Sequence, residues 1–496
     1  MRHRNIFYFS GYGTTFRESR STTAEVKALQ ATTWVCGISD TTPTIDDLLG
    51  DCHDGPSAAQ DNPGDAGHTP TLLMQAEIRR KANSWVQQAS RHAACITPTR
   101  GMPLRWEPRE GGTQEVMSLN TTTLDDNVHE DMRTGVVMLD LFGGIGTGLE
   151  ALLRTGTVIK RYIYVDRQDV ARRVMAARLE ELHEHYQQQL PLSAFADAFT
   201  ALPQDATHIS TTALTLAGAT DQNIRWVVVA GWPCQDFSPA GYRQGLDGVH
   251  AGAYHVMLHI LAMLQSMQRN KPPTYLLENG PVQLATNPKN NLQRDFASIT
   301  AQIGEPVLLD ATQFGACAYR LRNWWTNLID PALLRAITAT VQRPPGLFVH
   351  QIPDSNHELT AVRRSNSPPY YSVNMGAELE ALPTLMSRVG SYAFVLGEPG
   401  SLHIKGTDRY EEPSAEERER ALGYATGTTR APGVTNVQRR VLLGSCMDAN
   451  CIQSIFAIVA AVYRHKGSPA CMVQTNTSEQ EVTGLARPPP LMSWLL

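Results

Sequence analysis

The chain has 496 residues, 42% of them hydrophobic, and a formal net charge of −5. That length is enough for two to four domains, or for one large domain with insertions. The net charge gives no overall support for nucleic-acid binding, and no run reaches the roughly 18 apolar residues of a membrane span. The first residues lack the apolar core and cleavage site of a secretory signal, so we expect no signal peptide.

Eight cysteines are spread along the chain without a CxxC pair or a zinc-ligand spacing. This pattern predicts a reducing, intracellular setting and no bound metal. Three arginine pairs are candidates for a local nucleic-acid surface, although such pairs are more often simply solvated. They are Arg172–Arg173, Arg363–Arg364 and Arg439–Arg440.

Residues 1–134 are rich in Thr, Ser, Asp and Gly and show little sustained periodicity. One amphipathic stretch, residues 72–89, predicts a helix. The rest of this region is predicted to be loop or partly disordered, and it carries no chemical motif.

Strands and helices begin to alternate at residue 135. Short apolar runs rich in β-branched residues predict buried strands, and the amphipathic stretches between them predict helices. In chain order the predictions are 135–156 (strand, glycine turn, helix), 160–177 (strand, helix), 226–230 (strand), 255–267 (helix), and 273–280, 305–315 and 323–328 (strands). This alternation predicts a doubly wound α/β fold with a parallel sheet and right-handed crossovers.

The regular alternation ends after residue 330, where Pro, Ser and Asn become frequent, and helical patterns return near residue 413. We therefore predict five parts. They are a poorly defined N-terminal region (1–134), a core (135–330), an irregular region (331–412), a C-terminal part of the core (413–466) and a flexible tail (467–496).

A glycine-rich turn joins the first predicted strand to the first helix. Glycines let the backbone approach a ligand closely, and the helix that follows presents its amide end. Gly144, Gly146 and Gly148 give GxGxG and not the GxGxxG of dinucleotide sites. Asp166 follows the second strand, where an acid binds ribose hydroxyls, and Asp205 is predicted to contact an adenine amino group after a third strand. These features predict a nucleoside pocket without a pyrophosphate; a tight turn without a ligand is the alternative.

The stretch 226–241 leads from a buried strand into Pro233 and Cys234. The proline stiffens the backbone before the thiol, and open α/β sheets bind ligands at the ends of such interior strands. A packed core thiol is an equally weighted alternative, because free cysteines are often buried.

Charged side chains follow at the same predicted edge of the sheet. Glu278 ends the strand predicted at 273–280, and Arg320 and Arg322 are two residues apart, hence on one side of an extended strand. Paired guanidiniums suit a phosphate, a carboxylate or a polar base edge. Taken singly, Glu278 also fits a surface acid or a helix cap, and the arginines fit surface charge.

Together these groups match one chemistry, methyl transfer to carbon-5 of cytosine. That carbon is not nucleophilic while the ring is aromatic, but a thiolate added to carbon-6 makes an enamine that can attack a sulfonium methyl. A carboxylate that holds ring nitrogen-3 and the exocyclic amine stabilises the adduct, and arginines can hold the carbonyl oxygen of the base. The combination predicts that Cys234 is a nucleophile.

These motifs resemble those of the cytosine-5 DNA methyltransferase family, in that family's order, from about residue 136 to 464. The resemblance implies a Rossmann-like fold, S-adenosyl-L-methionine as cofactor and DNA as partner. It assigns the nucleophile to Cys234 in "GWPCQDFSPAG", the base-gripping acid to Glu278 in "LLENG", where Asn279 follows, and the paired arginines to Arg320 and Arg322 in "YRLRNWW". The residues it implies for cofactor binding are Phe142, Gly143, Gly144, Ile145, Gly146, Thr147, Asp166, Asp205, Pro233 and Ser445.

The stretches "ERERALGYATG" and "QRRVLLGSCMDANC" resemble the family's last two motifs, most closely those of its eukaryotic de novo branch, which implies a nuclear location. The family's GNSV reads GSCM here, at residues 444–447. The region before these motifs reads DNA in the family, where the target base must leave the duplex. The contact residues implied are Arg363, Arg364, Tyr370, Tyr371 and Arg388, with ordinary loop surface as the alternative for each.

Two other functions fit the sequence. One is the same chemistry on RNA, but the RNA-acting branch usually carries a second proline before its cysteine, where this chain has Trp232. The other is a catalytically silent protein that keeps the fold and binds a partner. The altered GNSV motif favours that alternative, whereas the intact Cys234 and Glu278 argue against it.

Overall fold

We analysed a computed structural model of the chain. The residues that it describes are 119, 127–237, 242, 244–284, 292–341, 351–359, 381–388, 394 and 400–466. The helix predicted at 72–89 and the tail at 467–496 lie outside the described residues. The five predicted parts of the chain remain predictions.

A six-stranded sheet forms the centre of the molecule, with strand order β2-β1-β3-β4-β6-β5. Its strands are β1 (Val136–Leu141), β2 (Ile159–Val165), β3 (Trp226–Gly231), β4 (Thr274–Asn279), β5 (Val307–Asp310) and β6 (Leu321–Thr326). The first four in chain order pair in parallel, as predicted, but β6 runs antiparallel to both of its neighbours. The reason is the connection from β5 to β6: residues 311–320 are too few for the crossover of a dozen or more residues that a parallel return needs.

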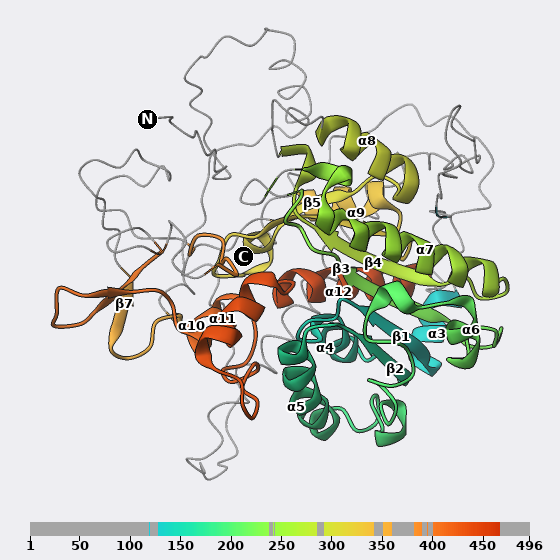
Figure 1. Cartoon of the computed structure of the whole chain (residues 1–496), viewed down its shortest axis with the longest axis horizontal. Helices are drawn as coiled ribbons and strands as arrows, with labels where there is room; N and C mark the ends of the chain where they lie inside the picture. The colour runs from blue at the N-terminus through green and yellow to red at the C-terminus, as the bar shows by residue number, and fades with distance from the viewer. Residues whose placement is uncertain are drawn as a thin grey trace, which may run out of the picture.

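Helices cover both faces of the sheet (Figure 1). They are α3 (Asn127–Thr134), α4 (Thr147–Arg154), α5 (Asp169–His185), α6 (Thr211–Leu216), α7 (Gly252–Met267), α8 (Leu292–Ile303), α9 (Pro331–Ala339), α10 (Ala415–Ala421), α11 (Asn436–Ser445) and α12 (Ala449–Lys466). Short 3-10 helices are η2 (Leu192–Ala194), η3 (Ala206–His208), η4 (Gly245–Asp247), η5 (Val249–Ala251), η6 (Val282–Leu284) and η7 (Ala311–Phe314).

Alternate residues of β1 point into two different apolar cores, as the two-residue period of a strand requires. Val136 and Met138 pack with side chains of α4, α5 and α12. Val137 and Leu139 pack with side chains of α6, α7 and α8 on the other face. The doubly wound α/β fold predicted from the sequence is therefore confirmed.

A third apolar core joins the sheet to the C-terminal elements. It includes Ile145 of the glycine turn, Val174 of α5, and side chains of α10 and α11. A small antiparallel sheet lies beside α10, away from the central sheet (Figure 1). Its strands are β7 (His357–Leu359), β8 (Leu402–Ile404) and β9 (Tyr410–Glu411).

The strand order reverses at β1, because β2 lies on one side of it and β3 on the other. In open α/β sheets, ligands bind in the crevice outside the carboxyl ends of the strands at such a switch point. The loops after β1 and β3 border this crevice. Within the described residues no single helix has the length and apolarity to cross a membrane; α11 and α12 pass that test only as a pair bent by 40°.

Candidate active site

The loop after β1 has a backbone that departs from ordinary geometry. Phe142 has a φ of 54°, and Gly144 and Gly146 have φ values of 54° and 72°. A positive φ is uncommon for a residue other than glycine and marks strain that often accompanies a ligand site. A Cβ at Gly144 would meet nothing closer than 3.9 Å, so this part of the loop borders open space.

The other glycines of the loop pack tightly against the protein. A Cβ at Gly143 would lie 2.7 Å from the ring of Tyr164, whose hydroxyl donates to the carbonyl of Gly144 (2.8 Å). A Cβ at Gly146 would overlap Met175. The buried Ile145 offers its carbonyl to the guanidinium of Arg178. Contacts with Tyr164, Met175 and Arg178 therefore fix one side of the loop, while the Cβ position at Gly144 has no close neighbour.

Asp166 follows β2 and lies against this loop. Its two carboxylate oxygens accept from the backbone N–H of Gly144 (3.0 Å) and Gln168 (2.8 Å). Burial raises the pKa of Asp166, against the lowering effect of these N–H groups. A carboxylate oxygen can accept more than one hydrogen bond, so Asp166 retains capacity for ribose hydroxyls.

Asp205 is exposed and caps η3, accepting from the backbone N–H of Thr207 (3.0 Å). This hydrogen bonding lowers the pKa of Asp205. The prediction that a third strand precedes it is wrong, because no strand lies between β2 and β3. The charge of Arg167 nevertheless acts on both Asp205 and Asp166, so the two acids border one region.

Cys234 follows β3 and is half-buried. Two residues earlier, Trp232 is buried between the rings of Tyr254 (5.4 Å between centroids) and Trp325 (5.3 Å). Its carbonyl accepts from the side-chain amide of Asn279 (2.8 Å). Aromatic packing and this hydrogen bond therefore fix the chain directly before Pro233 and the thiol.

Glu278 lies near the end of β4, where it pairs in register with Gly231 of β3. Its Oε1 lies 2.8 Å from Nε of Arg322. The two atoms are not aligned as a hydrogen bond, and Oε1 is buried without a hydrogen-bond donor. We interpret the contact as an ion pair that leaves the carboxylate able to accept from a ligand.

Arg320 is buried beside the same carboxylate. Its guanidinium donates to the carbonyls of Gly444 (3.4 Å) and Cys446. Burial lowers the pKa of Arg320, but the charges of Glu278, Cys446, Asp448 and Cys234 together raise it. For Arg322, burial and the charge of Arg320 lower the pKa, while Glu278 and Cys234 oppose them. Both guanidiniums thus share one electrostatic environment with Cys234 and Glu278.

The loops after α10 and α11 lie against the start of α4 and the end of β3. The hydroxyls of Thr147 and Tyr424 are 2.6 Å apart, and Tyr424 donates to the carbonyl of Met447 (2.7 Å). Met447 also reaches the end of β3, where a Cβ at Gly231 would lie 3.0 Å from its Cε. Ser445 is exposed, and its hydroxyl donates to carbonyls of its own helix. The structure therefore does not bring the Ser445 hydroxyl into contact with the glycine loop.

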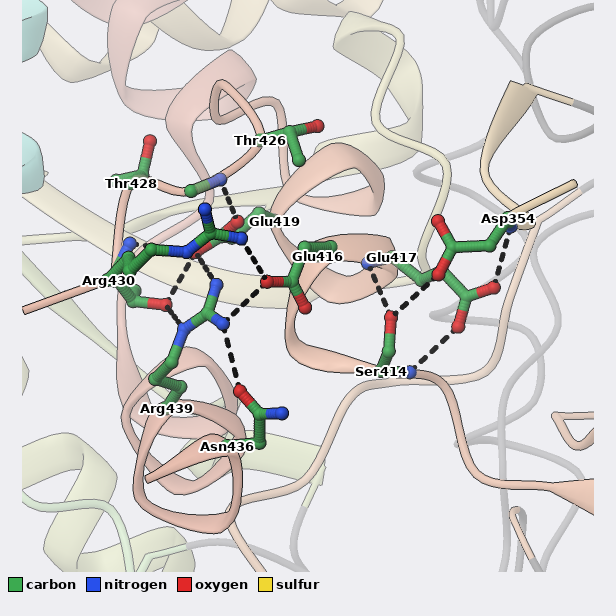
Figure 2. Close-up of polar contacts among 12 residues, drawn as sticks. Asp354, Ser414, Glu416, Glu417, Glu419, Thr426, Thr428, Arg430, Asn436 and Arg439 are labelled. Carbon is green, nitrogen blue, oxygen red and sulfur yellow. Dashed lines mark hydrogen bonds and ion pairs between the residues drawn. The ribbon is translucent and has the colours of Figure 1, made fainter. Parts of the chain in front are cut away.

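A buried ion-pair network holds α10 against α11 (Figure 2). Arg439 donates to Glu416 (2.6 Å) and Glu419 (2.9 Å), and Glu419 also accepts from the backbone N–H of Thr429 (2.7 Å). Arg439 is 3% exposed, so it is not available as a nucleic-acid contact. The prediction that the Arg439–Arg440 pair offers such a surface is wrong for Arg439.

The carboxyl and imidazole groups of Asp354, His357 and Glu417 lie close together beside this network. Glu417 is the third residue of α10 and accepts from the backbone N–H of Ser414 (2.8 Å) and of Asp354 (2.8 Å) and from Nδ1 of His357 (2.7 Å). Helix capping accounts for the cluster, so it does not indicate a metal site.

The segment 381–388 lies against the site. Leu382 exchanges backbone hydrogen bonds with the residues directly before Arg320. A Cβ at Gly444 would overlap the backbone of Met386 and Ser387. Arg388 ends this segment and is exposed. The other predicted DNA contacts lie outside the described residues; they are Arg363, Arg364, Tyr370 and Tyr371.

Sequence reasoning missed several residues that build this site. Arg178 and Tyr424 hold the glycine loop and α4, and Asp236 accepts from the backbone N–H groups of His250 (2.7 Å) and Ala251 (3.2 Å) before α7. Tyr424 lies within a motif that the resemblance covers, but its partners are distant in sequence. Only Asp236, two residues after Cys234 and within the nucleophile motif, had a local signal, because short acids often cap helices.

Residues 204–326 match the family model described as C-5 cytosine-specific DNA methylase. This range contains Cys234, Glu278, Arg320 and Arg322. The chain is also 32% identical over 78 residues to the type II methyltransferase M2.BsuMI of Bacillus subtilis (strain 168). That match covers 16% of this chain and about a fifth, 19%, of the relative's length.

Solved structures that match part of the chain include the Entamoeba histolytica methyltransferase EhMeth and the S. pombe Dnmt2 methyltransferase. Both are 13% identical to this chain, with TM-scores of 0.41 and 0.43. The matches cover 66% and 65% of this chain and 98% of each neighbour. The matched family model and the local identity to a type II methyltransferase both support a relationship to the C-5 cytosine-specific DNA methylase family, and the model match covers residues 204–326.

Proposed function

We propose that this protein transfers a methyl group from S-adenosyl-L-methionine to carbon-5 of cytosine in DNA. One observation carries the proposal: Cys234, Glu278, Arg320 and Arg322 gather at the carboxyl ends of β3 and β4, next to the crevice bordered by the glycine loop. A thiol, a carboxylate and two guanidiniums arranged in this way suit this reaction more directly than any other.

The residues around the crevice fit the cofactor. The open face at Gly144 admits a ligand against the backbone, and Asp166 offers carboxylate oxygens for ribose hydroxyls. Asp205, which borders the same region, would accept from an adenine amino group. Phe142 and Pro233 are the apolar residues that would flank it. When bound, this cofactor supplies a methyl group made electrophilic by its sulfonium.

The chain's own residues perform the chemistry on the base. The Cys234 sulfur forms a bond to carbon-6, and the electron pair displaced from the ring double bond makes carbon-5 nucleophilic. Glu278 holds ring nitrogen-3 and the exocyclic amine, and the ion pair with Arg322 orients it. After carbon-5 is methylated, a solvent base takes its proton, the C–H electron pair re-forms the double bond between carbon-5 and carbon-6, and the carbon–sulfur bond breaks to restore the thiolate.

DNA is the proposed polymer for two reasons. The matching family model is described as a DNA methylase, and Trp232 stands where the RNA-acting branch usually has a second proline. The net charge of −5 means that any binding surface must be local. The nuclear location and the likeness to the eukaryotic de novo branch stay predictions.

A direct test uses labelled cofactor with separate DNA and RNA substrates. Label transferred to cytosine in DNA, absent in Cys234→Ala, is the expected result. An oligonucleotide with 5-fluorocytosine should trap a covalent adduct, because the fluorine at carbon-5 cannot leave as a proton does. If only RNA were labelled, the substrate would be RNA and not DNA.

The same experiment separates an enzyme from a catalytically silent protein. Glu278→Gln keeps the size of the side chain but removes its charge, so we expect methyl transfer to fall while cofactor binding persists. Cofactor binding by the wild type without transfer to either polymer would favour the silent alternative. No cofactor binding at all would contradict the proposed pocket.

A further inference from the structure

One aromatic side chain beside the nucleophile is exposed. Tyr242 retains 69% of its accessible surface. The other strongly exposed large hydrophobic residues of the described chain are aliphatic and lie on other elements; they are Leu192, Leu216, Leu308, Val437 and Val441. Leaving a large aromatic ring in water is unfavourable, which points to a ligand that covers it.

Backbone hydrogen bonds place Tyr242 next to the reacting thiol. The backbone N–H of Tyr242 donates to the carbonyl of Gln235 (2.7 Å), the residue that follows Cys234. Three residues later, the N–H of Gly245 donates to the carbonyl of Asp236 (2.9 Å). The backbone of Tyr242 therefore lies against the nucleophile motif, one residue along the chain from Cys234.

The ring of Tyr242 is stacked on that of His250, with 5.8 Å between centroids and an angle of 12° between planes. His250 is itself anchored, because its backbone N–H donates to the side chain of Asp236 (2.7 Å). Asp236 is fully buried. The pair thus forms an aromatic surface in which the His250 ring stacks on the Tyr242 ring, and Tyr242 is still accessible to solvent.

A nucleobase is the ligand whose chemistry this surface fits best. A cytosine that leaves the stack to reach Cys234 leaves its neighbours without a stacking partner. Aromatic side chains stack on bases without regard to their identity, because every base has a π face. A flat, supported ring beside the thiol is placed to restore part of that lost stacking.

We propose that Tyr242, backed by His250, is a stacking platform for a base adjacent to the target cytosine, an inference that rests on the proposed function. Tyr242→Ala should weaken binding of a single-target oligonucleotide by about 5- to 150-fold, the range expected for one stacked base. Tyr242→Phe should bind as the wild type does, because the ring remains. Leu216→Ala, which also removes an exposed apolar side chain, should change nothing.

A thermodynamic cycle tests the base directly. Oligonucleotides carry an abasic site on either side of the target cytosine, and affinity is measured by fluorescence anisotropy for the wild type and Tyr242→Ala. One abasic substitution should weaken binding by the wild type but not weaken binding by Tyr242→Ala further. Thermal unfolding of the variant is measured alongside and should match the wild type.

The platform would be overturned if Tyr242→Ala and each abasic site weakened binding additively. It would also be overturned if Tyr242→Ala bound the intact oligonucleotide as the wild type does. Loss of thermal stability with normal binding would make the tyrosine structural and overturn it too. If wild type transfers no methyl group but shows the expected coupling, the platform stands and the proposed function fails. If wild type transfers methyl without the coupling, the proposed function stands and the platform fails.

Discussion

Gly148, the last glycine of the GxGxG pattern and the second residue of α4, packs closely against Val229 of β3, so Gly148→Ala is an informative substitution. A Cβ there would lie 2.8 Å from Cγ1 of Val229, against at least 3.4 Å for an ordinary contact. Val229 is β-branched and stiff, so it cannot turn away. The helix must therefore withdraw by about 0.6 Å, and it carries the loop around Gly144 with it.

Two opposing effects set the size of the stability change. Alanine favours a helix over glycine by about 0.5–1 kcal/mol, while overpacking costs about 1–3 kcal/mol. We expect a net loss of about 1 kcal/mol in the free energy of unfolding, measured by urea titration. Because the loop moves with α4, S-adenosyl-L-methionine should bind about tenfold more weakly in calorimetry, equivalent to about 1.4 kcal/mol.

Gly252→Ala is the matched control. Gly252 is the first residue of α7, has a helical φ of −51°, and a Cβ there would meet nothing within 4 Å. The same substitution should therefore stabilise the protein by about 0.5–1 kcal/mol and leave cofactor affinity unchanged. If Gly148→Ala matched Gly252→Ala in stability and bound the cofactor normally, close packing at Gly148 would not position the loop.

Three further predictions concern buried charges. Burial raises the pKa of Asp140 to about 8, so the folded chain holds a proton that the unfolded chain releases above about pH 4. The wild type should then lose up to about 1.4 kcal/mol of stability per pH unit from pH 4 to 8, a loss that Asp140→Asn lacks. Glu419→Gln should cost about 3–5 kcal/mol by leaving Arg439 short of a buried counter-charge, measured by urea unfolding. Arg322→Lys should lower kcat about 100-fold at unchanged cofactor affinity, because the lysine ammonium cannot place its charge where Nε of the guanidinium lies against Glu278.

Each of these has a result that contradicts it. A constant difference in stability between Asp140→Asn and the wild type across this pH range would mean that the carboxyl is not protonated in the folded state. For Glu419→Gln the control is Glu130→Gln at the exposed pair with Arg133, where no measurable change is expected; equal effects would contradict the role of burial. For Arg322→Lys, normal kcat would show that Glu278 needs no guanidinium to orient it.

The sequence was sufficient to predict the α/β fold and its parallel strands, whereas the roles of Cys234 and Glu278 stay predictions. β-Branched runs such as 226–230 can form only buried strands in this context, and parallel strands place their carboxyl ends at one edge. Cys234 and Glu278 were therefore predicted to lie at the same edge of the sheet, and the structure pairs Gly231 with Glu278 on neighbouring strands. The direction of β6 was not predictable in this way, because the residue pattern of a strand is the same in either direction. The only signal was the short connection from β5.

Contacts between distant segments had no signal at all in the sequence. Thr147 and Tyr424 are 277 residues apart and share a buried hydrogen bond. Arg439 looked like surface charge because it stands beside Arg440, and only the fold brings Glu416 and Glu419 to it. Buried polar pairs of this kind depend on which surfaces meet, a property of tertiary packing and not of local pattern.

The same contacts bear on whether the altered final motif implies a silent protein. The stretch 444–447 reads GSCM where the family has GNSV, yet three of its described hydrogen bonds to the site use backbone carbonyls. Arg320 donates to the carbonyls of Gly444 and Cys446, and Tyr424 donates to that of Met447. A carbonyl is present whatever side chain its residue carries, so these three acceptors survive the loss of the asparagine. The close approach of Gly444 to the backbone of Met386 and Ser387 also restricts residue type, and that glycine is kept. The change from GNSV to GSCM therefore leaves the hydrogen bonds between the C-terminal segment and the rest of the site in place. It gives little support to a loss of activity.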